Sequence, residues 1–119
     1  MSHIQDAINY LVGAKTILST LIELRDIDIL DSDTFIDMQN IVHRLVDRAN
    51  MSLSDTKKEL SMYKNRIEEI QELIDKILSN ITELSYYDNN RILTYNIARI
   101  IGQIDIVIEL LIPMKEREV

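Results

Sequence analysis

Apolar residues in the middle of the chain recur at alternating intervals of three and four positions. This spacing keeps one face of an α-helix apolar, with the period of 3.5 residues that is typical of coiled coils. It predicts a long helix over residues 53–84, with a coiled-coil-like seam. The seam consists of Leu53, Thr56, Leu60, Tyr63, Ile67, Ile70, Ile74, Ile77, Ile81 and Leu84.

Three more helices are predicted from the same kind of spacing. The helix over residues 2–25 has the seam Ile4, Ala7, Leu11, Ala14, Leu18 and Leu21. The helix over residues 34–50 has the seam Phe35, Met38, Val42, Leu45 and Ala49, and Asp31, Ser32 and Asp33 are candidate N-caps. The helix over residues 89–112 has the seam Leu93, Ile97, Ile100, Ile104, Val107 and Leu111, and Pro113 is expected to end it.

The junction between the second and third helices is harder to define. The apolar spacing slips between Ala49 and Leu53, and Ser52-Leu-Ser-Asp55 resembles a capping box. We predict a tight turn there. The alternative is one bent, continuous helix, because neither Gly nor Pro forces a stop.

The low content of helix breakers sets the fold class. The 119 residues include one Pro and two Gly, too few for the turns of a strand-rich fold. We therefore predict one domain, residues 1–119, folded as an all-α antiparallel four-helix bundle. At 1.5 Å per residue the third helix would be about 48 Å long and the second about 25 Å. The shorter second helix would leave one end of the isoleucine seam of the third helix uncovered. A second protomer is expected to cover that end, which predicts a homodimer.

Charge and composition narrow the classes of partner. The net charge of −7 argues against nucleic-acid binding and is compatible with a basic protein partner. The N-terminus has no basic leader, and three charges interrupt the apolar window of residues 92–112. We expect no membrane insertion and a cytoplasmic location.

Four carboxylates fall within the stretch RIEEIQELID. The string Glu68-Glu-Ile-Gln-Glu72 resembles the first half of the metal site of the all-α nucleotide pyrophosphohydrolases, which pair E-E-x-x-E with E-x-x-D from a later helix. That second half is missing here, because E-x-x-D occurs only at residues 23–26, upstream, and at residues 72–75, overlapping the first string. The seam places Glu68, Glu69, Glu72 and Asp75 away from the packed side. We predict a solvated face.

No other residues form a recognisable catalytic or metal-binding motif. His43 and Asp47 lie four apart but on the outward side of their helix, and His3 stands alone near the N-terminus. There is no Cys, no nucleophile elbow and no Gly-rich phosphate loop. We therefore expect no catalytic, cofactor-binding or metal-binding residues, no cofactor, and a protein that is not an enzyme.

Two surfaces are candidate interaction sites. The first is an acidic patch of Asp26, Asp28, Asp31 and Asp33, for which the alternative is a solvated capping loop. The second is a small-residue notch, Ala98-x-x-x-Gly102, flanked by Ile106 and Ile112, as an oligomer contact. Here the alternative is a glycine tolerated in a fully buried helix, where it costs about 0.5–1 kcal/mol relative to Ala.

The lack of a recognisable catalytic motif and the two candidate interaction surfaces favour a small non-catalytic protein that binds another protein. Regulators, immunity proteins and chaperone-like adaptors of phage or mobile elements have this profile. One alternative is a small all-α metal-dependent nucleotide hydrolase or nucleotide-binding protein. Another is a structural subunit of a larger assembly.

Overall fold

The computed structural model describes residues 3–26, 31–87 and 89–117, without the side chains of residues 25 and 26. Over these residues the chain is helical and contains no strand, as predicted. The α-helices are α1 (His3–Asp26), α2 (Ser32–Glu59), α3 (Lys64–Glu83) and α4 (Asn90–Glu116). Two short 3₁₀ helices, η1 (Ser61–Tyr63) and η2 (Leu84–Tyr86), follow α2 and α3.

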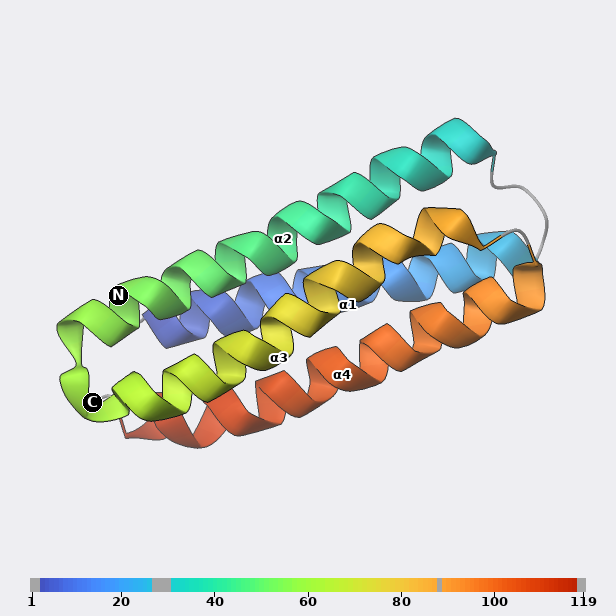
Figure 1. Ribbon diagram of the computed structural model, residues 1–119. Helices are drawn as coiled ribbons and strands as arrows, with labels where there is room; N and C mark the ends of the chain where they lie inside the picture. Colours follow the sequence, from blue (N-terminus) through green and yellow to red (C-terminus); the bar gives the residue numbers. More distant parts are fainter. Residues whose placement is uncertain (1–2, 27–30, 88, 118–119) are drawn as a thin grey trace.

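The four α-helices pack as a ring in which each contacts two neighbours. Helix α1 lies against α2 and α4, and α3 lies against the same two helices (Figure 1). The bundle measures 47 × 22 × 20 Å, so it is about two helix diameters of roughly 10 Å across. The start of α1 and the end of α4 lie at the end of the bundle that holds the α2–α3 connection (Figure 1).

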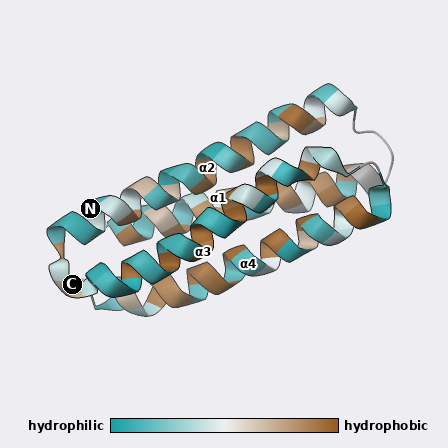
Figure 2. Ribbon diagram, in the orientation of Figure 1, coloured by the Kyte–Doolittle hydropathy of each residue, from teal (hydrophilic) through white to brown (hydrophobic). Residues whose placement is uncertain are grey.

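The core is aliphatic and draws on all four helices. Figure 2 shows hydrophilic residues over much of α2 and α3, and long hydrophobic stretches on α4. The predicted seams of α1 and α4 are confirmed, since each of their residues is buried. In α3 the isoleucines at 67, 70, 74, 77 and 81 are at most 2% exposed. Burial at this level contributes about 1.5–3 kcal/mol per side chain.

The predicted turn near residues 50–53 is wrong, because α2 continues to Glu59. Its buried residues are Phe35, Gln39, Val42, Val46, Ala49, Leu53 and Thr56. These alternate four and three apart without a slip. The slip seen in the sequence came from placing Met38 and Leu45 in the seam, whereas both are only half-buried. Ser52 and Ser54 do not cap a helix: the Ser52 carbonyl accepts from the Thr56 hydroxyl, and Ser54 contacts α3.

The break falls instead at Leu60, between α2 and η1. Leu60 adopts φ −125° and ψ 82°, and its N–H still donates to the Thr56 carbonyl at 2.8 Å. The third helix therefore covers residues 64–83 rather than 53–84. With 28 residues in α2 and 20 in α3, no long α3 extends beyond a short α2. The helix lengths therefore give no reason to expect a second protomer.

Pro113 does not end α4, which continues to Glu116. The next position of the α4 seam is Met114, which is buried at 3% exposure, and its packing keeps the last turn helical. Pro113 itself is exposed, so the carbonyl deprived of its donor lies on the side of the helix that faces water.

Helix α1 also has the length and composition of a membrane span. Within the described residues, His3–Leu24 passes this test with a mean hydropathy of 1.2. A core helix of a bundle passes the same test, and Ile4, Leu11 and Leu18 of this stretch are fully buried here.

The position of the α2–α3 break is testable with two proline substitutions of the same residue type. Ser52→Pro should lower the free energy of unfolding by about 3 kcal/mol or more, because it removes a donor inside α2. Ser61→Pro should stay within about 1 kcal/mol of wild type, since it follows Leu60, whose backbone is not helical, and begins a helical turn. Urea denaturation measures both. The reverse order would restore the turn at residues 50–53.

Candidate interaction site

A cavity of about 280 Å³ opens between the N-terminal half of α2 and the C-terminal end of α3. We call it the α2–α3 groove. It is lined by Ile36, Gln39, Asn40, His43, Ile81, Thr82, Ser85 and Tyr86. Its position follows from the register of α2, which turns Gln39 toward α3 and leaves Ile36 and His43 beside it.

Gln39 forms the buried floor of the groove. Its side chain is 7% exposed and its Nε2 donates to the carbonyls of Ile81, at 2.7 Å, and Thr82, at 3.2 Å. Carbonyls in the last turn of a helix lack their usual α-helical donors. Here α3 tightens into η2, where the Leu84 N–H also donates to Ile81. Gln39 therefore ties α2 to the end of α3.

The exposed lining of the groove combines two large apolar side chains with the polar Asn40, His43, Thr82 and Ser85. Ile36 is 45% exposed on α2, and Tyr86 is 76% exposed on η2. Large side chains left this open on both sides of a cavity are able to cover a partner's apolar group. Sequence reasoning missed Ile36, Gln39 and Tyr86. The seam it used for α2 assigned Met38 to the core, and Tyr86 fell between the helices predicted over residues 53–84 and 89–112.

The two segments that form the groove carry more acidic than basic residues, although no acid lines the cavity itself. From Ser32 to Asp47, α2 carries three aspartates, one arginine and His43; from Asp75 to Tyr86 there are two acids and one lysine. Asp33, Asp37 and Glu83 are exposed. The excess of negative charge gives the groove an electrostatic preference for a basic segment.

The predicted acidic patch is described only in part. Asp31 and Asp33 are exposed at the start of α2, whereas Asp28 and the Asp26 side chain lie outside the described residues. Asp31 is the N-cap of α2: its Oδ1 accepts from the Thr34 N–H at 2.7 Å. This backbone hydrogen bond, with a smaller contribution from the Thr34 hydroxyl, lowers the pKa of Asp31. Capping is therefore an established role of at least one member of the patch.

The carboxylates of RIEEIQELID lie outside the core, as predicted. Glu69, Glu72 and Asp75 are exposed, and the Glu68 side chain, 45% exposed, lies 3.9 Å from Lys57 Nζ. Across the described parts of the chain, no group of three or more His, Cys, Asp and Glu side chains is placed to hold a metal ion. His43 and Asp47 are both exposed, as expected, and His3 Nε2 lies 3.2 Å from Glu59.

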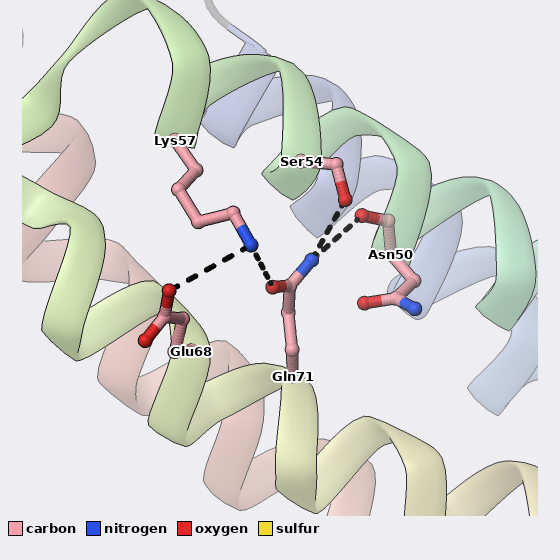
Figure 3. A network of polar contacts seen from close by, with 5 residues as sticks. All are labelled: Asn50, Ser54, Lys57, Glu68 and Gln71. Atoms are coloured by element: carbon pink, nitrogen blue, oxygen red, sulfur yellow. Dashed lines mark hydrogen bonds and ion pairs between the residues drawn. The ribbon is translucent and has the colours of Figure 1, made fainter.

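A polar network joins α2 and α3 at the other end of their interface (Figure 3). Gln71 Nε2 donates to Ser54 Oγ at 2.9 Å and to the Asn50 carbonyl at 3.3 Å. Gln71 Oε1 accepts from Lys57 at 3.4 Å. Among the described atoms, Asn50 Oδ1 is buried without a hydrogen-bond partner. The network fixes how α2 and α3 pack, and this packing leaves the groove at their far end.

The predicted oligomer residues Ala98, Gly102, Ile106 and Ile112 are all exposed on α4. The alternative of a fully buried helix is therefore wrong. A Cβ added at Gly102 would meet no atom within 4 Å. Ile106 also borders a cavity of about 60 Å³ between α3 and α4.

No family model, curated protein or solved structure matches this chain.

The two hydrogen bonds of Gln39 predict a marked loss of stability in Gln39→Leu. This change removes the side-chain donor of the Ile81 carbonyl and one of the two side-chain donors of the Thr82 carbonyl, which still accepts from the Ser85 hydroxyl at 3.4 Å, at a cost of about 1–3 kcal/mol. The matched control is Asn40→Leu, at the neighbouring exposed position, which should change the free energy of unfolding by less than about 0.5 kcal/mol. Urea titration measures the free energy of unfolding of both variants. A neutral Gln39→Leu would show that this contact does not hold the groove together.

The N-cap predicts a pH dependence of stability at Asp31. Because folding lowers its pKa, Asp31 stabilises the fold above its ordinary pKa of 3.8 and loses this effect as the pH falls through the folded value. Asp31→Ala should therefore melt below wild type at pH 7, with the gap closing at acidic pH. Asp31→Ser keeps a cap that does not titrate, so it should lack the closing gap. Thermal melts from pH 7 to about pH 2 measure this. A gap that is independent of pH would contradict the capping role.

Proposed function

We propose that this protein is a small non-catalytic interaction protein that binds a basic segment of another protein in the α2–α3 groove. The observation that carries the proposal is the pair Ile36 and Tyr86, exposed on either side of the same cavity. In a monomer of this size, large apolar side chains gathered around a hollow favour a partner contact. The acids nearby favour a positively charged segment over nucleic acid.

Gln39 supports this proposal because it makes the groove a preformed feature of the bundle. A site whose walls are held by buried hydrogen bonds loses less conformational entropy on binding than a mobile one. Helix-in-groove binding suits such a surface, with one apolar anchor between Ile36 and Tyr86 and basic side chains toward Asp33, Asp37 and Glu83. We further propose that the helices run antiparallel in a single domain, and that the protein acts in the cytoplasm.

Site-specific cross-linking tests this proposal in a lysate of the native host. A photoreactive benzoylphenylalanine at Tyr86, 76% exposed, should capture a partner protein. The matched control is the same group at Met62, 80% exposed but remote from the groove, which should not capture it. Ile36→Ser should reduce capture at position 86, and so should 1 M salt, where the Debye length is about 3 Å.

Two outcomes would contradict the proposal. In the first, positions 62 and 86 yield the same products, and Ile36→Ser has no effect on them. In the second, Mg²⁺ with a nucleotide raises the melting temperature, and replacing Glu68, Glu69 and Glu72 with Gln abolishes the rise. Because a ligand specific for the native state stabilises it by mass action, that result would favour the nucleotide-binding alternative.

A further inference from the structure

The outer face of α4 carries exposed apolar residues that no other described part of the bundle covers. Tyr95 is 67% exposed and Ile106 is 53% exposed, and exposed Ala98 and Gly102 lie between them. Ala98, Gly102 and Ile106 follow one another at intervals of four residues, so they lie on nearly the same side of the helix. We call this surface, with Arg99, Glu109, Ile112 and Pro113, the α4 face.

Among the described residues, no neighbour lies close enough to require a glycine at position 102. A Cβ there would meet open space, whereas a Cβ at Gly13 would contact Leu45 at 3.6 Å. A glycine in the middle of a helix costs about 0.5–1 kcal/mol relative to Ala. Because Gly102 has no side chain, the α4 face is flat at this position, and another helix can approach it closely.

The residues of the α4 face complement one another when the helix is paired with an antiparallel copy of itself. We place the two-fold axis level with Ile104. A residue that precedes Ile104 by a given number of positions then lies level with the residue of the copy that follows Ile104 by the same number. Gly102 then lies level with Ile106 of the copy, so that a small residue meets a large one. Arg99 lies level with Glu109, and Tyr95 with Pro113, whereas one turn farther out Arg91 lies level with Arg117. Two-fold symmetry forms each of these contacts twice.

We infer that the protein forms a homodimer through the α4 face, with Ile106 of each protomer packed on Gly102 of the other and Arg99 opposite Glu109. The charges at the centre of the face favour a second copy, since Arg99 and Glu109 lie on opposite sides of that centre and complement each other, while the exposed Arg91 and Arg117 lie level with each other farther out, near the two ends of α4. A partner that was only basic would leave Arg99 facing a like charge.

The dimer deepens the proposed function without depending on it. Helix α4 packs against α1 and α3, so its outer face points away from α2 and leaves the α2–α3 groove open. Two grooves in one particle would bind a repeated or dimeric partner with higher avidity than one groove. The dimer is measurable in the absence of any partner, so failure of the dimer and failure of groove binding are separate results.

Sedimentation equilibrium of the full chain tests the dimer with two sets of variants. Gly102→Leu fills the flat point and should raise the dimer dissociation constant at least tenfold, while the fold tolerates it because the site is open. Ser79→Leu, at an exposed position of α3, is the matched control and should leave dimerisation unchanged. Circular dichroism melts should show both variants folded.

A charge exchange tests the register of the pair. Arg99→Glu and Glu109→Arg should each weaken the dimer, because they create like-charge contacts, and the double variant should regain most of the lost affinity. A chain that sediments as a monomer at every concentration would overturn the inference. So would a dimer that is insensitive to Gly102→Leu, or one that the double charge exchange does not restore.

Discussion

The structure depends on the burial of aliphatic side chains from four helices in one shared core. In α3 this burial is concentrated in five isoleucines, and α1 and α4 each add a seam of their own to the same core. Burying one of these side chains contributes about as much as two or three net hydrogen bonds. The exposed carboxylates of RIEEIQELID follow from this constraint: once Ile67, Ile70 and Ile74 face inward, their acidic neighbours face water.

The sequence predicted much of this fold because three of its seams are purely apolar. It failed at α2, where the core position nearest the groove is occupied by Gln39. A polar residue is accepted there because two carbonyls at the end of α3 satisfy it, and that partner is 42 residues away in the chain. No local pattern reveals such a contact. Val46, by contrast, was a usable signal: with Val42 and Ala49 it gives the observed spacing without a slip.

The candidate site was predicted even less completely than the fold. The α2–α3 groove needs the register of α2, the end of α3 and the turn at Tyr86 together, and the error in α2 concealed it. The residues of the α4 face were identified because an apolar surplus and a mid-helix glycine are visible in the sequence. The helix lengths give no reason to expect a dimer, because α2, with 28 residues, is longer than α3, with 20. The proposed dimer therefore depends on the self-complementarity of α4 alone.

The most direct test of the isoleucine core compares neighbouring positions in the middle of α3. Ile74 is fully buried and Asp75 is exposed. Urea denaturation of Ile74→Ala should show a loss of about 2–5 kcal/mol in the free energy of unfolding. Asp75→Ala should change it by less than about 0.5 kcal/mol. Equal effects at the two positions, or a larger loss at Asp75, would mean that α3 turns a different face to the core and would contradict the account.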